Sequence, residues 1–118
     1  MGGTSVKSVY SLKSSDTNSK EINLTSVICS GWGFDYKASC VKSFAEYLTT
    51  QGYTVNMTQK SASGFGGEYN ISINHKGNDT FIFSNSTKHK GAIISAADDV
   101  YGNRIKIKEL IDEIVKVW

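Results

Sequence analysis

Hydrophobic and polar residues follow two different periods along this chain, and the changes between them divide the sequence into elements. A β-rich run from Ile22 to Cys29 ends at Ser30-Gly31, which is typical of a buried strand that stops at a turn. Residues 53–58 alternate apolar and polar, so they predict a strand with one buried face. Residues 69–74 alternate in the same way, and a glycine-containing turn joins them to the β-rich residues 80–84, which predicts a hairpin.

Two other stretches carry the period of a helix. Between Gly33 and Gly52 apolar residues recur at spacings of three and four, and Gly52 is a natural C-terminal stop. The last stretch of the chain places an apolar stripe along one helix face, formed by Ile107, Leu110, Ile111, Ile114 and Val117. A helix between two strands predicts a parallel pair, and the hairpin adds antiparallel strands. We therefore expect a thioredoxin-like α/β domain of order β-α-β-β-β-α, with a mixed four-stranded sheet and the two helices arranged either as two layers or as a sandwich.

The first twenty residues lack a clear period. Val6, Val9 and Leu12 would suit a short edge strand, but the polar residues 14–19 outweigh them. We therefore expect residues 1–20 to form a flexible polar N-terminal tail and residues 21–118 to form the domain. The pattern of residues 86–101 predicts neither a helix nor a strand.

Length and charge restrict the class of protein. A chain of 118 residues suits one hydrophobic core. The net charge of +2 is small and the lysines are scattered, so the basic stripe of a nucleic-acid-binding protein is absent from the sequence. No apolar run approaches the ~20 residues that cross a bilayer, and residues 1–20 lack the apolar stretch of a signal peptide. We expect a cytoplasmic monomer that binds neither nucleic acid nor membrane.

The cysteine count favours a reducing compartment. Two cysteines are too few for a disulfide scaffold or a metal cluster, so we expect no metal. Asn-x-Ser/Thr sequons begin at five positions, which are Asn23, Asn56, Asn70, Asn78 and Asn85. They leave open a secreted glycoprotein domain. Strands bring residues i and i+2 to one face, however, so polar strand faces produce this spacing without any glycan.

Cys29 lies where the predicted first strand meets the predicted first helix. A thiol at such a junction meets unpaired amides and the positive end of the helix dipole, which lower its pKa. Thioredoxin-like folds place a Cys-x-x-Cys motif there, in which one sulfur attacks a disulfide and the second resolves the mixed disulfide. The candidate chemical centre is therefore Cys29, with Ser30, Gly31, Trp32 and Gly33 as the residues that would bind a substrate or partner.

Several short motifs resemble the selenoprotein W (Rdx) family, whose first strand ends in Cys-x-x-Cys or Cys-x-x-selenocysteine followed by Gly and an aromatic residue. Cys29, Gly33 and Phe34 match this motif. Residues 67–73 resemble the family's Gly-x-Phe-Glu-Val-x-Val strand, with the aromatic and acidic residues transposed. Phe83-Ser84, the basic segment 88–91 and the terminal helix are also similar, so the resemblance spans residues 22–117 in element order. It implies a thioredoxin-like fold and thiol redox chemistry linked to glutathione and to protein partners.

The chain departs from this family at Trp32, which stands where the second cysteine or selenocysteine is expected. Cys40 lies on the order of 12 Å farther along a helix, which is too far for a disulfide with Cys29. It is therefore a poor replacement for the second cysteine of the motif. The leading hypothesis is a selenoprotein W-like protein, at most a weak monothiol oxidoreductase, in which Cys29 forms a mixed disulfide with glutathione or with a protein thiol. No resident cofactor is expected. The alternative is a redox-inactive protein-interaction module that retains the fold.

Three of the candidate features, Cys29, Trp32 and the segment 88–91, have two interpretations each. Cys29 is either reactive or an inert remnant of the motif, and Trp32 either docks a partner or packs on the core. Cys40 is expected to be a packing residue. The segment Lys88-His89-Lys90-Gly91 either holds an anion or is a solvated loop. His75 is expected to be a surface residue at a strand end.

Overall fold

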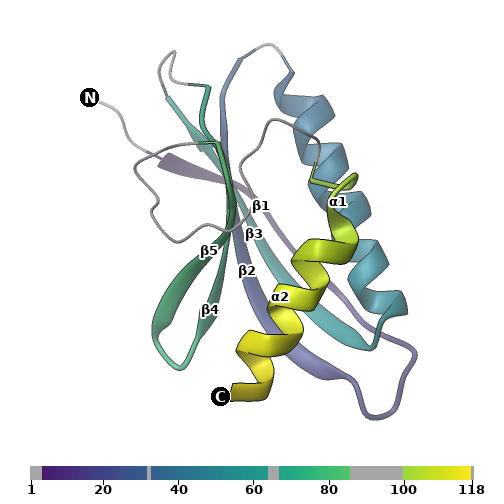
Figure 1. Cartoon of the computed structure of the whole chain (residues 1–118). Helices are drawn as coiled ribbons and strands as arrows, with labels where there is room; N and C mark the ends of the chain where they lie inside the picture. The colour runs from purple at the N-terminus through teal and green to yellow at the C-terminus, as the bar shows by residue number, and fades with distance from the viewer. Residues whose placement is uncertain (1–3, 32, 64–66, 86–99, 118) are drawn as a thin grey trace.

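A computed structural model describes residues 4–31, 33–63, 67–85 and 100–117 of the chain. Within these residues the order of elements is β-β-α-β-β-β-α (Figure 1). The elements are β1 (Thr4–Leu12), β2 (Lys20–Cys29), α1 (Phe34–Thr50), β3 (Tyr53–Ala62), β4 (Tyr69–His75), β5 (Asn78–Ser84) and α2 (Arg104–Val117).

The strands form one mixed sheet in the order β1-β3-β2-β4-β5. β2 and β3 are parallel and α1 connects them, whereas β1 pairs antiparallel with β3 and β4 pairs antiparallel with β2. β4 and β5 form the predicted hairpin. The parallel pair and the hairpin are thus confirmed, but the sheet has five strands and not four.

Both helices lie on the same side of the sheet (Figure 1), so the domain has two layers and the sandwich arrangement is wrong. Alternate residues of β2 and β3 face the helices and are buried. The sequence predicts this alternation for β3, whereas it predicts a buried strand without alternation for β2. Their partners on α1 lie three or four residues apart, at Val41, Phe44, Ala45 and Leu48. One contiguous core therefore joins the central strands to α1 and α2.

The turn from α1 into β3 depends on Gly52. The backbone of Gly52 has φ 93°, a left-handed conformation that favours glycine over residues with a side chain. Gln51 N–H donates to the carbonyl of Leu48 at 3.0 Å, which closes the last turn of the helix. Gly52 is therefore the helix stop that its position in the sequence predicts.

The predicted tail is wrong between Thr4 and Leu12, because these residues form β1. Val6 lies opposite Lys60 and Val9 opposite Thr58, with a register shift at Lys7. The extra residue at this bulge puts Val6 and Val9 on one face of the sheet although they are three residues apart. Because of the bulge, the apolar residues of β1 do not follow simple alternation, so the sequence pattern does not predict this strand.

The polar residues after β1 form an ordered turn and not a flexible tail. The hydroxyl of Ser14 donates to the Thr49 carbonyl at 2.8 Å, at the end of α1. The side chain of Asp16 accepts a hydrogen bond from Asn18 N–H at 2.9 Å, an Asx turn that explains the Asp-Thr-Asn sequence. These contacts hold the connection to β2 against the end of α1.

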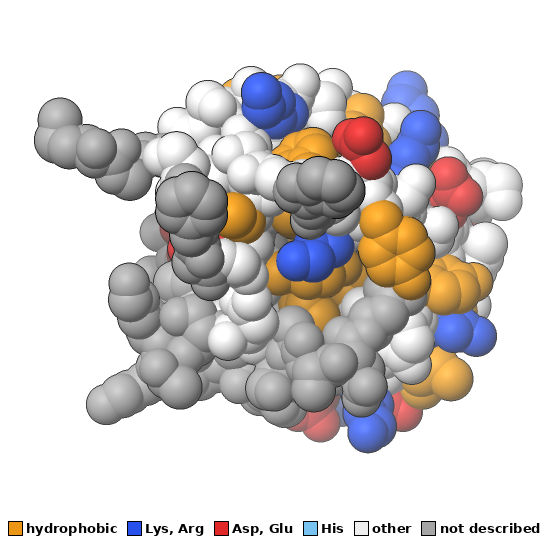
Figure 2. All heavy atoms as spheres, turned by 90° about the horizontal axis from the view of Figure 1, so that it is seen from above, with side chains coloured by type: hydrophobic (Ala, Val, Ile, Leu, Met, Phe, Trp, Pro, Cys, Tyr) orange, Lys and Arg blue, Asp and Glu red, His pale blue; other side chains and the backbone are white. Residues whose placement is uncertain are grey.

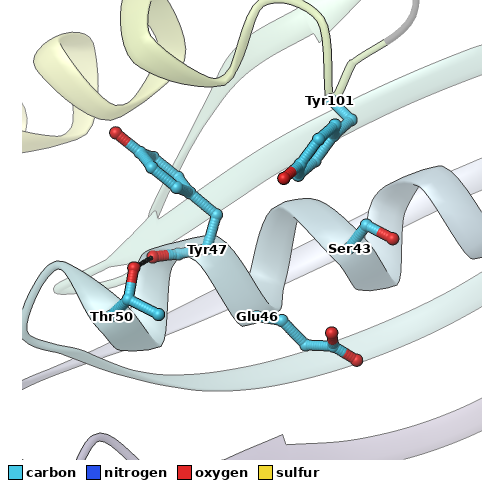
Figure 3. A pocket seen from close by; sticks show the side chains of 5 residues that line it. All are labelled: Ser43, Glu46, Tyr47, Thr50 and Tyr101. Atoms are coloured by element: carbon cyan, nitrogen blue, oxygen red, sulfur yellow. Dashed lines mark hydrogen bonds between the residues drawn. The ribbon is translucent and has the colours of Figure 1, made fainter.

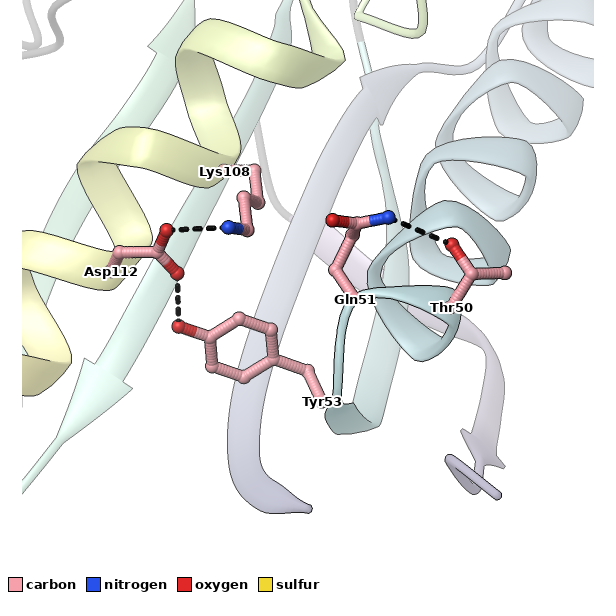
Figure 4. Close-up of polar contacts among 5 residues, drawn as sticks. All are labelled: Thr50, Gln51, Tyr53, Lys108 and Asp112. Atoms are coloured by element: carbon pink, nitrogen blue, oxygen red, sulfur yellow. Dashed lines mark hydrogen bonds and ion pairs between the residues drawn. The ribbon is translucent and has the colours of Figure 1, made fainter. Parts of the chain in front are cut away.

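A polar cluster joins α2 to the sheet (Figure 4). The hydroxyl of Tyr53, at the start of β3, donates to Oδ1 of Asp112 at 2.5 Å. Lys108 approaches the other oxygen of Asp112 at 2.7 Å, one helical turn away. Burial raises the pKa of Tyr53 above its ordinary range, and the hydrogen bond to Asp112 adds to the shift. The phenol is therefore a neutral donor that fixes α2 over the end of the central strands.

Candidate functional site

Cys29 is the last residue of β2 and lies opposite Ala62 of β3. Its neighbour Ile28 is fully buried among core residues, so strand alternation turns the Cys29 side chain to the other face of the sheet. We call this the outer face, defined on β2 by Asn23, Thr25, Val27 and Cys29. The thiol is half-buried there, at the end of a central strand.

Backbone hydrogen bonds fix the position of Cys29 on both sides. Its N–H donates to the Glu68 carbonyl at 2.7 Å, just before β4. The N–H of Ser30 donates to the Ala62 carbonyl at 2.8 Å, so the residue after the cysteine is still held by β3. The thiol therefore belongs to a rigid strand end and not to a loop.

The turn that follows leads into α1. The N–H of Phe34 donates to the Gly31 carbonyl at 3.1 Å, and that of Lys37 donates to the Gly33 carbonyl at 2.9 Å. Gly33 caps the helix with φ 89°, a left-handed conformation that suits glycine. Ser30, Gly31 and Gly33 are all exposed.

The structure brings Cys29, Ser30, Gly31 and Gly33 together at one end of the sheet, while Trp32 lies outside the described residues. The sequence predicts a thiol beside the helix N-terminus. The structure instead places it on the sheet face that α1 does not cover. Figure 2 looks onto this end of the molecule, where hydrophobic and basic side chains reach the surface side by side.

The other sequence candidates lie apart from this centre. Cys40 is half-buried on α1 and packs against the core, as expected, and it is not joined to Cys29 by a disulfide. His75 is half-buried at the end of β4, so it is less exposed than a surface residue. The segment 88–91 lies outside the described residues, as do residues 64–66. No group of ligating side chains in the described ranges could hold a metal ion.

The outer face carries ordered rows of polar side chains. One row crosses all five strands through register partners, which are Ser11, Asn56, Asn23, Asn74 and Asp79. Asn56 accepts from the hydroxyl of Ser11 at 2.7 Å and donates to Oδ1 of Asn23 at 3.0 Å. The sequons that begin at Asn23, Asn56 and Asn70 lie on these strands. Strand alternation therefore accounts for their spacing, as the sequence suggested.

Two hollows lie beside α1. The first has a volume of about 510 Å³ and is lined by Ser43, Glu46, Tyr47, Thr50 and Tyr101 (Figure 3). The guanidinium of Arg104 stacks 4.5 Å from the ring centre of Tyr101 and 5.6 Å from that of Tyr47. Because Arg104 already covers these aromatic faces, the hollow is explained by the packing of α2 on α1.

The second hollow has a volume of about 470 Å³ and lies between α1 and the β1 side of the sheet. Its lining residues are Ser8, Tyr10, Asp35, Ala38, Ser39, Lys42 and Gln59. The sequence reasoning missed this site. Its signal is Gln59, a polar residue at a position where the alternation of β3 predicts a buried apolar side chain.

Comparisons with known proteins identify no family for the chain. No protein-family model matches it, and no curated protein or solved structure is significantly similar to it. Within the described residues, neither helix combines the length and the apolar composition that crossing a bilayer requires. The chain is an α/β two-layer domain with a mixed five-stranded sheet.

Proposed function

We propose that this chain is a selenoprotein W-like thiol redox protein with a thioredoxin-like fold, in which Cys29 forms a mixed disulfide with glutathione. The observation that carries the proposal is the position of Cys29. Its thiol ends a central strand, is half-buried on the outer face and immediately precedes the exposed turn Ser30-Gly31. A thiol at this place is accessible to a small disulfide, while the strand holds it in a fixed position.

The strand arrangement supports the same proposal. A parallel pair connected by a helix, with an antiparallel hairpin beside the first strand of that pair, is what the family resemblance implies. β2, α1, β3, β4, β5 and α2 supply this set in order, and β1 is an addition at the outer edge of β3. A reducing compartment rich in glutathione, such as the cytoplasm, suits this chemistry.

The reaction needs only one protein thiol. The Cys29 thiol loses its proton to solvent, and the thiolate attacks one sulfur of glutathione disulfide. The disulfide bond of glutathione breaks, a bond from Cys29 to glutathione forms, and the second glutathione leaves as a thiolate. A further glutathione thiolate then attacks the mixed disulfide, which releases Cys29 and restores glutathione disulfide. With Trp32 at the second motif position, no neighbouring thiol resolves the adduct.

The mass of the intact protein after incubation with glutathione disulfide at neutral pH tests this proposal. We expect one glutathione adduct on the wild type and on Cys40→Ser, and none on Cys29→Ser. Cys40→Ser is the matched control, because Cys40 is also half-buried but packs against the core. A folded wild type that gains no adduct, although both cysteines react in denaturant, would overturn the proposal.

A second candidate is a redox-inactive interaction module. The supporting observation is the exposed apolar surface of β1, where Val6 is 56% and Val9 is 70% exposed on the same outer face as Cys29. This candidate predicts that a bound protein partner is retained equally by the wild type and by Cys29→Ser. Its binding, measured by calorimetry, would instead fall after Val9→Ser.

A further inference from the structure

The first two turns of α1 contribute less to the core than the turns that follow. The buried residues of this helix all lie from position 41 onward, and they are Val41, Phe44, Ala45 and Leu48. Residues 34–40 include none of them. Phe34, Ala38 and Cys40 contact the core, but they are only partly buried. The first two turns are therefore held to the sheet by less apolar burial than the rest of the helix.

The sheet beneath these turns is largely polar. Because β2 and β3 are parallel and α1 connects them, α1 begins over the ends of both strands and finishes over their starts (Figure 1). Ser26, Gln59 and Ser61 face the helix near the strand ends and are buried, beside the apolar Ile28. We call these three polar residues the polar floor. The positions that face the later turns are apolar, and they are Ile22, Leu24, Val55 and Met57.

Two atoms of the polar floor lack a hydrogen-bond partner within the described residues. They are Oγ of Ser26 and Oε1 of Gln59, two residues that are register partners on β2 and β3. Nε2 of Gln59 is satisfied, because it donates to the Ser26 carbonyl at 3.3 Å and to the Lys60 carbonyl at 2.9 Å. A buried polar atom without a partner destabilises the arrangement that buries it. Water that reaches these two atoms when the helix lifts therefore offsets part of the free energy of opening.

The start of α1 is also weakly fixed at its end and along one side. Gly33 stands at the cap position and supplies no side-chain hydrogen bond to the first turn. The 470 Å³ hollow lies between these turns and the β1 side of the sheet, and its lining includes the exposed residues Asp35 and Ser39. Solvent therefore reaches the β1 side of the first two turns. Burial, capping and packing are thus all weak over the same stretch of helix.

We propose that residues 34–40 of α1 open from the sheet as one local unit while the rest of the domain stays folded. Opening breaks the helix hydrogen bonds of these residues, exposes little apolar surface and gives water to the polar floor. The exposed turn after Cys29 then becomes part of a loop from Ser30 to Cys40, which can adapt its shape to a protein partner. The opening does not depend on the thiol chemistry, and only this last consequence rests on the proposed function.

Native-state hydrogen exchange, followed residue by residue with NMR, tests the opening. The amides of residues 38–41 donate to carbonyls within the opening unit. We expect these amides to have equal protection factors, at least about 100-fold lower than those of residues 45–48. Low concentrations of urea should leave their exchange unchanged, because a local opening exposes little surface. Cys29→Ser should exchange as the wild type does, so a failed glutathione experiment leaves this result standing.

Variants of the polar floor test the cause of the opening. Gln59→Met keeps the length of the side chain and makes the floor more apolar, so the protection of residues 38–41 should rise about threefold to tenfold. Thr58→Val is the matched control, because it makes the preceding residue of the same strand apolar on the outer face. It should leave these amides unchanged. Ser26→Ala removes the buried hydroxyl without a partner and should act in the direction of Gln59→Met, which keeps the test decisive if Gln59→Met does not fold.

Three results would overturn the proposal. Equal protection along the whole of α1 would mean that the helix opens only when the domain unfolds. Protection that rises evenly from Lys37 to Leu48 would mean the ordinary fraying of a helix end. Unchanged exchange of residues 38–41 in the folded floor variants would exclude the polar floor as the cause.

Discussion

At the scale of single residues, the contact between Tyr53 and Asp112 connects the central strand β3 to α2. Tyr53→Phe removes the donor of this hydrogen bond and keeps the ring. We expect the free energy of unfolding to fall by about 1 to 2 kcal/mol, because Asp112 then retains only Lys108. Urea unfolding measures the change. Tyr47→Phe is the control, since the hydroxyl of Tyr47 makes no hydrogen bond within the described residues, and an equal loss in both variants would contradict the role of Tyr53.

A second residue-scale prediction concerns alkaline pH. Burial, followed by the nearby Glu46 carboxylate, raises the pKa of Tyr10 to about 12, whereas an unfolded tyrosine ionises near ~10. The folded state therefore holds this proton more tightly, and the stability it contributes is complete below about pH 10 and lost as the pH rises through about 12. Urea unfolding across this window should show a steeper decline for the wild type than for Tyr10→Phe. Identical declines would mean that Tyr10 is solvated in the folded state.

At the scale of elements, β1 owes its register to the bulge at Lys7. Deletion of Lys7 leaves Val6 opposite Lys60 and Ser8 opposite Gln59, now without a register shift. We expect the free energy of unfolding to change by less than about 0.5 kcal/mol. The edge, however, loses a lysine and a bulge, two features that prevent strands of different molecules from pairing. Sedimentation velocity should therefore detect self-association of the deletion variant. Lys13→Ala, which removes a lysine outside the strand, is the control and should sediment as the wild type does.

The sequence predicts most elements because their periods are regular. The apolar phase of β3 and the stripe of α1 are buried as predicted. In β4 the polar phase is buried too, at Asn70 and Ser72, and in α2 Ile107 and Ile111 are the buried members of the stripe. The sequence does not predict β1, because the bulge breaks its period. The apolar stripe of α2 does not by itself indicate which side of the sheet the helix covers.

At the candidate site, the position of Cys29 follows from the sequence. Its direction was not predicted: from the sequence we expected the thiol beside the helix N-terminus, although Ile22, Leu24 and Ile28 on even positions of β2 assign the odd positions to the outer face.

The sequence does not predict the 470 Å³ hollow, because its lining residues are far apart in the chain. Tyr10, Asp35 and Gln59 come from three different elements, and only the pairing of β1 with β3 brings them together. Without β1 in the predicted fold, no pattern within one segment places these side chains around one space. Gln59 alone carried a signal, as a polar residue in the buried phase of its strand.

At the scale of the whole molecule, the chain behaves as one domain with one core. Its radius of gyration is 13.5 Å, which equals the value of about 13.5 Å expected for a compact domain of this length. Phe44, fully buried on α1, belongs to the cluster that also contains Ile107 and Ile111 of α2. We expect Phe44→Ala to cost about 3 to 5 kcal/mol. Circular dichroism and tyrosine fluorescence should then still report one shared unfolding transition, and separate transitions would indicate two independent units.

The place of β1 in the sheet also has a consequence for biosynthesis. β1 is made before the other described strands, and among them it pairs with β3, which ends at Ala62. At about 5 to 20 residues per second, the ribosome needs roughly 3 to 10 s after Leu12 to complete that partner. During this interval the nascent strand has nothing to pair with. Its serines and lysine keep it soluble, so the polar character that resembles a disordered tail in the sequence protects this early-made strand until β3 is complete.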